Sequence, residues 1–161
     1  MPMETPVPTS AVRVAEAAAR AGLATRVIEM TVATRTAEEA ARACDCDAAQ
    51  IVKSLIFRGR TTGVPYLLLV SGRNRVDETK VAGVIGESIT RPDAAYVRDI
   101  TGFAIGGIPP IGHANRLLTY IDIDLLGFTE VWAAAGTPRC VMKLDPQALK
   151  RAVDATEIAV C

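Results

Sequence analysis

The sequence predicts a mixed α+β fold, and three observations lead to this class. Half of the 161 residues are hydrophobic and 22% are charged, which is typical of an ordered globular chain. Strand-like runs outnumber helix-like runs, and several follow one another with no helix between them. A chain of this length can bury one sizeable core. We therefore expect a single domain over 1–161, with 1–8 as a flexible leader.

Capping residues mark where the helices begin. Thr36 and Glu39 have the spacing of a capping box, and Pro146 stands at a first helical position. The predicted helices span 9–20, 36–43, 77–85, 91–97 and the residues after 145. Helical spacing in the first helix predicts an inward-facing stripe, made of Val12, Ala15, Ala19 and Leu23.

Short runs rich in β-branched and aliphatic residues predict the strands. These runs span 26–30, 51–57, 66–71, 117–123, 130–134, 139–144 and 156–160. The segment 58–64 is expected to join the second and third strands as a hairpin. Asp47 is expected to cap a brief turn before the second strand.

Lys53 lies inside the apolar strand 51–57. Alternation places it on one face with Leu55 and Phe57, and places Ser54 on the other face. Lysine is rarely buried without a partner, so its position is unusual. Two readings stay open from the residues alone. Lys53 either belongs to a functional site or is an edge-strand lysine whose ammonium reaches water.

A glycine- and proline-rich loop runs from Phe103 to His113. Glycine permits close backbone approach, while two consecutive prolines stiffen the chain and remove two N–H donors. The remaining amides, at Gly106, Gly107, Ile108 and Ile111, would then point in fixed directions and suit a carbonyl, an oxyanion or a phosphate. A plain structural turn is the alternative reading.

Lys53 and this loop together resemble the YbaK family of aminoacyl-tRNA deacylases, which includes the editing domain of bacterial prolyl-tRNA synthetases. The resemblance covers about residues 25 to 160. It extends to the segments 67–82, 99–103, 120–122 and 135–137. It implies a largely antiparallel, partly barrel-like sheet surrounded by helices.

The resemblance also implies the chemistry. Water would attack the ester that joins an amino acid to the terminal adenosine of a tRNA, and a hydroxyl of the terminal ribose would assist by proton transfer. Lys53, Gly106 and Gly107 are the expected catalytic residues, with the two glycine amides as oxyanion donors. The ammonium of Lys53 would contact the substrate end or the adenosine phosphate.

Six further residues are expected to contact the substrate, namely Ile108, Pro109, Pro110, His113, Ala134 and Gly136. His113 has two readings, as a base or as a hydrogen-bonded structural residue. Cysteinyl-tRNA-specific relatives tend to have a serine where this chain has Ala134, which argues against specificity for cysteine. Arg73 and Arg75 have two readings as well, as contacts to the tRNA backbone or as a solvated loop.

Composition excludes several classes of protein. The formal net charge is zero, so the chain is not expected to hold a long nucleic acid by charge alone. A single histidine excludes a multi-histidine metal centre, and four cysteines without a CxxC motif indicate reduced thiols. No apolar run approaches the roughly 20 residues of a membrane helix. We expect no metal, no cofactor and a cytoplasmic location.

The leading hypothesis is a free-standing deacylase that edits mischarged tRNA, with tRNA(Pro) carrying a small wrong amino acid as the expected substrate. Its expected partners are the aminoacyl-tRNA acceptor end and prolyl-tRNA synthetase. The alternative is a non-catalytic module that binds a nucleotide or a tRNA end beside a synthetase. Retention of both Lys53 and the glycine loop favours the enzyme.

Overall fold

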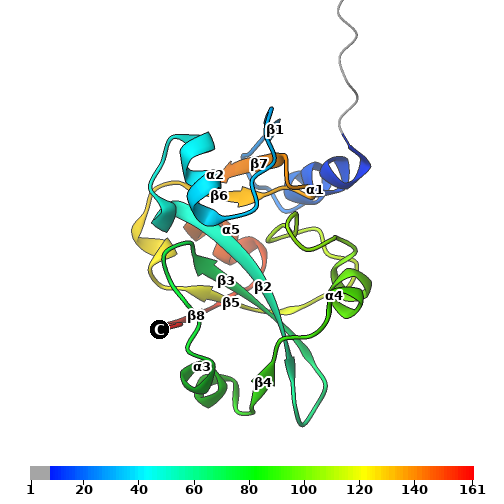
Figure 1. Ribbon diagram of the computed structural model, residues 1–161, viewed down its shortest axis with the longest axis vertical. Helices are drawn as coiled ribbons and strands as arrows, with labels where there is room; N and C mark the ends of the chain where they lie inside the picture. The colour runs from blue at the N-terminus through cyan, green and yellow to red at the C-terminus, as the bar shows by residue number, and fades with distance from the viewer. Residues whose placement is uncertain (1–7) are drawn as a thin grey trace, which may run out of the picture.

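The computed structural model describes residues 8–161, which form five α-helices, two short 3-10 helices and eight strands (Figure 1). The expected flexible leader lies outside these residues except for Pro8. The helices are α1 (Thr9–Arg20), α2 (Ala37–Cys44), α3 (Glu78–Ile85), α4 (Ala94–Thr101), α5 (Pro146–Ala152), η1 (Ala48–Gln50) and η2 (Leu125–Gly127). The strands are β1 (Val27–Glu29), β2 (Ile51–Gly59), β3 (Pro65–Ser71), β4 (Ile89–Thr90), β5 (Leu118–Asp122), β6 (Val131–Ala134), β7 (Cys140–Leu144) and β8 (Thr156–Ile158).

All eight strands belong to one mixed sheet with the order β1-β7-β6-β2-β3-β5-β8, and β4 pairs with the end of β2. Four pairs are antiparallel, including the β2–β3 hairpin, and three are parallel, including β2–β6. The mixed α+β class is therefore confirmed. In the described part of the chain, β1 and β8 form the two ends of the ladder, so its hydrogen bonding is open.

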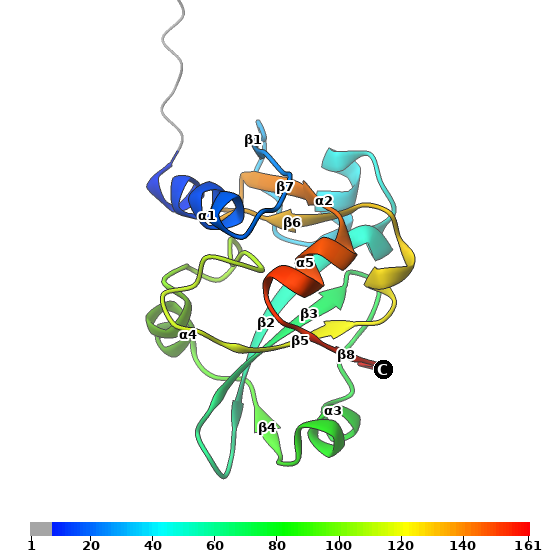
Figure 2. The same ribbon diagram turned by 180° about the vertical axis from the view of Figure 1, so that it is seen from behind.

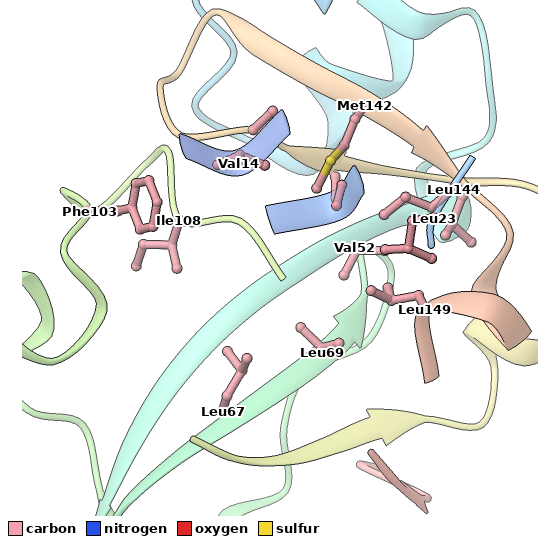
Figure 3. Close-up of a cluster of buried hydrophobic side chains, with 14 of the residues drawn as sticks. Val14, Leu23, Val52, Leu67, Leu69, Phe103, Ile108, Met142, Leu144 and Leu149 are labelled. Atoms are coloured by element: carbon pink, nitrogen blue, oxygen red, sulfur yellow. The ribbon is translucent and has the colours of Figure 1, made fainter. Parts of the chain in front are cut away.

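The β2–β3 hairpin is the centre of the fold, and it buries residues on both faces. Val52, Leu67 and Leu69 belong to the larger cluster, which Figure 3 shows beneath α1 and beside α5. Phe57 and Leu68 belong to a second cluster with Val81 of α3 on the other face. Alternation explains the division, because successive side chains of a strand point to opposite faces.

Helices cover the sheet unequally. Figure 2 shows α1 and α5 on the side turned toward the viewer, and Figure 1 shows α2 beside β2 on the opposite side. Val14 of α1 and Leu149 of α5 are fully buried in the larger cluster. α2 packs its Ala40 and Ala41 against Ile51, the first residue of β2. This third, smaller cluster sets the position of α2 above the strand that contains Lys53.

The structure corrects several local predictions. The buried stripe of α1 consists of Ala11, Val14 and Ala18, whereas Val12 is 40% exposed. α4 continues to Thr101, four residues beyond the predicted end. β4 and η2 were not predicted, because segments of two or three residues are too short to show a periodic pattern. The cap of α2 is confirmed, since the side chain of Thr36 accepts from the amide of Glu39 over 3.1 Å.

Candidate active site

A pocket of about 320 Å³ opens where β2 and β6 diverge. The parallel pairing of these strands ends at Val52 and Ala133, so the residues that follow each of them, Lys53 and Ala134, face a gap in the sheet. α2 closes one side of this gap, and the loop from Ile105 to Ile108 closes another. The walls are mostly apolar, which is typical of a small-molecule site with few polar groups.

Lys53 is half-buried at this pocket, and its ammonium has one partner in the backbone. Nζ donates to the carbonyl oxygen of Asn74 over 2.5 Å. Burial lowers the pKa of Lys53 because it disfavours the charged form, and the carboxylate of Glu38 opposes this effect. Two donor hydrogens of the ammonium remain for a ligand, because lysine carries three.

Two residues of the glycine loop that line the pocket have unused amides. Gly106 and Ile108 both line it, and neither N–H has an acceptor among residues 8–161. Gly106 has a φ of +100°, a backbone angle that favours glycine. Amides on either side of one residue can converge on a single oxygen atom, as the donors of an oxyanion hole do.

The amide of Gly107 is used inside the protein, which corrects its predicted role as an oxyanion donor. Its N–H donates to the carbonyl of Ala104 over 3.2 Å, and its carbonyl accepts from the amide of Gly136 over 2.9 Å. A Cβ on Gly107 would lie 2.7 Å from Cα of Thr137. Gly107 and Gly136 therefore join two turns in close contact, and neither lines the pocket.

Three other predicted substrate contacts lie away from the pocket. Nε2 of His113 is 2.7 Å from the carbonyl oxygen of Pro109, and its ring meets the edge of Phe103. Burial lowers the pKa of His113, which favours the neutral ring. Pro109 and Pro110 are buried. These three residues stabilise the loop on the side away from the pocket. The geometry therefore supports His113 as a hydrogen-bonded structural residue and not as a base.

Of the nine predicted site residues, the pocket brings together Lys53, Gly106, Ile108 and Ala134. Sequence reasoning missed Cys44 of α2 and Trp132 of β6, which also line it. Strand alternation predicts that Ser54 and Lys53 lie on opposite faces of the sheet, yet both side chains belong to residues that line the pocket. The Oγ of Ser54 is buried and has no hydrogen-bond partner within residues 8–161. The single tryptophan of the chain, inside the predicted strand 130–134, was the available signal for Trp132.

The pocket contains few groups that could transfer a proton. Arg35, Cys44 and Lys53 are its only titratable lining side chains within the described residues. Burial, with a smaller contribution from Cys46, raises the pKa of Cys44 to about 11, so the thiol keeps its proton at neutral pH. Among residues 8–161, no three His, Cys, Asp or Glu side chains gather to hold a metal. The same residues contain no helix long and apolar enough to cross a membrane.

The chain is similar to known proteins in sequence and in fold. Residues 31–152 match the model of the aminoacyl-tRNA editing domain. The chain is 31% identical over 123 residues to the uncharacterized protein YwhH of Bacillus subtilis, covering 76% of this chain and 78% of that protein. It is 26% identical over 117 residues to the "Putative Cys-tRNA(Pro)/Cys-tRNA(Cys) deacylase EbsC" of Enterococcus faecalis, covering 71% and 70%.

A solved structure is similar over almost the whole chain. It is the crystal structure of "a putative trans-editing enzyme for prolyl tRNA synthetase", with a TM-score of 0.89 and 44% sequence identity, covering 96% of this chain and 98% of that one. The matched family region includes β2, the glycine loop and β6, and thus every wall of the pocket. The chain belongs to the aminoacyl-tRNA editing domain family.

Proposed function

We propose that this protein hydrolyses the ester bond of mischarged aminoacyl-tRNA, acting in trans on tRNA(Pro) that carries a small wrong amino acid. One observation carries the proposal. Lys53 and the two loop residues with free amides, Gly106 and Ile108, line one small, mostly apolar pocket. Cations and oriented amides are the groups that stabilise the negative charge of an ester-hydrolysis transition state.

The reaction needs a nucleophilic water and a donor for the leaving group. Water attacks the ester carbonyl carbon, and the carbonyl oxygen becomes an oxyanion that the amides of Gly106 and Ile108 stabilise. The bond from carbon to the ribose oxygen then breaks, and the ribose oxygen takes up a proton. Because no carboxylate or histidine lines the pocket within residues 8–161, the substrate's own ribose hydroxyl is the group that relays the proton.

Lys53 acts as a positioned charge in this scheme. Its hydrogen bond to Asn74 fixes the direction of the ammonium. A fixed cation at the pocket can hold the terminal nucleotide so that the ester carbonyl meets the loop amides. Accurate positioning of this kind lowers the barrier without any further chemical group.

The lining supports a small aminoacyl group. Ala133 and Ala134 contribute only methyl groups to the lining, which Cys44 and Trp132 complete. Ala134 lacks the hydroxyl that a serine would offer to a polar substrate side chain. We infer that alanine or 2-aminobutyrate is preferred over serine. The expected partner is prolyl-tRNA synthetase, and the expected location is the cytoplasm, where charged tRNA is made.

The test is direct deacylation. tRNA(Pro) carrying labelled alanine, 2-aminobutyrate, cysteine, serine or proline is incubated with the protein, and loss of the esterified label is followed. We expect release of a small noncognate residue at least ten-fold above the spontaneous rate, while proline is retained. Binding of tRNA(Pro) without any release would instead favour the non-catalytic module.

A further inference from the structure

A second hollow adjoins the proposed ester pocket, and the two share Ala37 and Lys53. Four of the residues that line it are charged, namely Glu38, Lys53, Arg73 and Arg75. The ester pocket has mostly apolar walls, so the character of the surface changes at Lys53. A ligand that passes Lys53 would therefore go from an apolar into a charged environment.

The two arginines of this hollow differ in their partners. Arg73 forms an ion pair with Asp47, with Nε 2.8 Å from Oδ1 and Nη2 3.1 Å from Oδ2. The guanidinium of Arg75 has no ion pair or hydrogen bond with any residue from 8 to 161. It is close enough to Lys53 for its charge to lower the pKa of that lysine. Within the described part of the chain, Arg75 is thus the arginine of the hollow whose donors are all free.

The loop that contains both arginines is held in place on several sides. The side-chain amide of Asn74 donates to the carboxylates of Asp122 and Asp124 over 2.8 and 2.7 Å. The amide of Gly72 donates to the carbonyl of Ile51 over 2.8 Å. A Cβ on Gly72 would lie 2.3 Å from the carbonyl oxygen of Ala48. The loop backbone is thus preorganised, which reduces the entropy lost when a ligand binds.

We propose that this hollow is an anion subsite for the phosphodiester on the 5′ side of the terminal ribose, with Arg75 as its principal donor. The assignment rests on the proposed function, because it places the ester in the neighbouring pocket and the terminal ribose beside Lys53. The next group along the nucleotide is then a phosphate, and it reaches the shared edge of the two hollows. Guanidinium donors match the geometry of phosphate oxygens.

Glu38 refines the assignment. Its exposed carboxylate lines the same hollow and acts on Lys53 with the opposite sign to Arg75. It repels a phosphate and reduces the net positive charge around it. The subsite therefore binds weakly, as suits an enzyme that must release its tRNA.

The experiment compares a nucleotide with and without its phosphate. Adenosine 5′-monophosphate and adenosine are titrated separately into the wild-type protein, and dissociation constants are taken from NMR shift changes. We expect the monophosphate to bind about five- to ten-fold more tightly. Arg75→Gln should abolish this difference, and Glu38→Gln should increase it. Equal binding of the two compounds to the wild type would overturn the subsite.

Arg60→Gln is the matched control, because it removes the same charge from an exposed residue of the turn after β2, which lines neither of the two hollows. It should leave the preference for the monophosphate unchanged. If the Arg60 and Arg75 variants lost the preference for the monophosphate equally, the effect would be one of overall charge, and this result would contradict the subsite. Inorganic phosphate should compete with the monophosphate in the wild type and not in Arg75→Gln.

A kinetic comparison separates this inference from the proposed function. For aminoacyl-tRNA, Arg75→Gln should raise KM five- to ten-fold with kcat unchanged, and it should reduce the salt slope of log kcat/KM by about 0.7. For 2′(3′)-O-aminoacyladenosine, which has no phosphate, the variant should match the wild type. Equal losses on both substrates would refute the subsite alone. If the wild type hydrolysed neither substrate, the proposed function would be refuted. The nucleotide titrations would then still show whether the hollow binds a phosphate.

Discussion

Lys53 and Asn74 are joined by a hydrogen bond of 2.5 Å from Nζ to the backbone carbonyl oxygen. The side chain of Asn74 is itself held by Asp122, at the end of β5, and by Asp124. Asp122 and Asp124, about 70 residues beyond Lys53 in the sequence, therefore fix the position of the ammonium. They act through Asn74, which lies in the loop after β3. This relationship makes Lys53 a positioned charge and leads to the first prediction.

Replacement of Lys53 by alanine should reduce kcat/KM for deacylation at least ten-fold, about 1.4 kcal/mol of transition-state stabilisation. Lys53→Arg should also lower kcat/KM for deacylation, because a planar guanidinium does not reproduce a compact ammonium bonded to Asn74. Deacylation of labelled alanyl-tRNA(Pro) gives the rates, and circular dichroism verifies that the variants are folded. Full activity in a folded Lys53→Ala protein would exclude the proposed role.

The two adjacent glycines of the loop should respond differently to alanine. A Cβ on Gly107 would meet the backbone of Thr137 at 2.7 Å, whereas a Cβ on Gly106 would meet only Cγ of Pro138 at 3.7 Å. Gly106→Ala is strained by its positive φ, at a cost of about 1–3 kcal/mol. It should remove activity, because its methyl group changes the amide geometry at the pocket.

Gly107→Ala should lose more stability than Gly106→Ala, because a rigid backbone cannot move aside. Urea unfolding of both variants gives the comparison, and activity is measured under conditions in which each is folded. The opposite order of stability would mean that the contact between the turns at 107 and 136 is not rigid.

His113 should be dispensable for chemistry. Its Nε2 contacts Pro109, and the ring does not line the pocket. His113→Ala should keep kcat/KM within about three-fold while lowering the free energy of unfolding by roughly 2–4 kcal/mol, as for other large-to-small changes of packed side chains. A thousand-fold loss of activity in the folded variant would restore the reading of His113 as a base.

The same histidine makes stability depend on pH. Burial lowers its pKa in the folded protein below the ordinary value of 6.5, so the unfolded chain takes up the proton first as pH falls. The contribution of the neutral His113 ring to the free energy of unfolding is fully present above about pH 6.5 and is lost progressively below it. Thermal melts of wild type and His113→Ala between pH 5 and pH 8 should show the wild type losing its advantage on the acidic side.

Glu87 should hold the β2–β3 hairpin through its charge. Its carboxylate accepts from the amides of Thr61 and Thr62 at 3.0 and 3.1 Å, and from the hydroxyls of Thr62 and Tyr66, both at 2.7 Å. These bonds lower its pKa from 4.5 to about 2, with the hydroxyl of Thr62 as the largest cause. The stabilisation is present above pH 4.5 and is lost as pH falls toward 2.

Glu87→Gln should consequently melt at a lower temperature than the wild type at pH 7, and the gap should close as pH falls from about 4.5 to about 2. Differential scanning calorimetry over this range makes the measurement. A gap that stays constant with pH would show that the charge of Glu87 contributes nothing to the hairpin.

Ser54→Ala should not weaken the fold. Its hydroxyl is buried without a partner in the described residues, and removal of such a group relieves a desolvation cost of about 1–3 kcal/mol. We expect an unchanged or higher free energy of unfolding by urea. A clear decrease would mean that a bound water or a neighbouring group satisfies the hydroxyl in solution.

Local patterns in the sequence predicted most of the helices and strands and singled out part of the candidate site. The lysine inside an apolar run and the glycines before two prolines were visible as exceptions to ordinary patterns, and a resemblance between their spacing and a known family gave the reaction. Both features are local, since strand alternation and glycine geometry depend on adjacent residues. Local reasoning singled out Lys53, Gly106 and Ile108, and the resemblance added Ala134; the structure places all four at one pocket.

Tertiary structure alone decided that the backbone of Gly107 is tied to the turn at Gly136, and which arginine lacks a partner. The amide of Gly107 donates to the carbonyl of Ala104 within the same loop, whereas its carbonyl accepts from the amide of Gly136, 29 positions further along the chain. In the same way, Asp47 neutralises Arg73 and leaves Arg75 free. The bond between Gly107 and Gly136 joins residues 29 positions apart, and the Asp47–Arg73 ion pair joins residues 26 positions apart. Such contacts form because the folded sheet brings loops together, and they cannot be read from the order of residues along the chain.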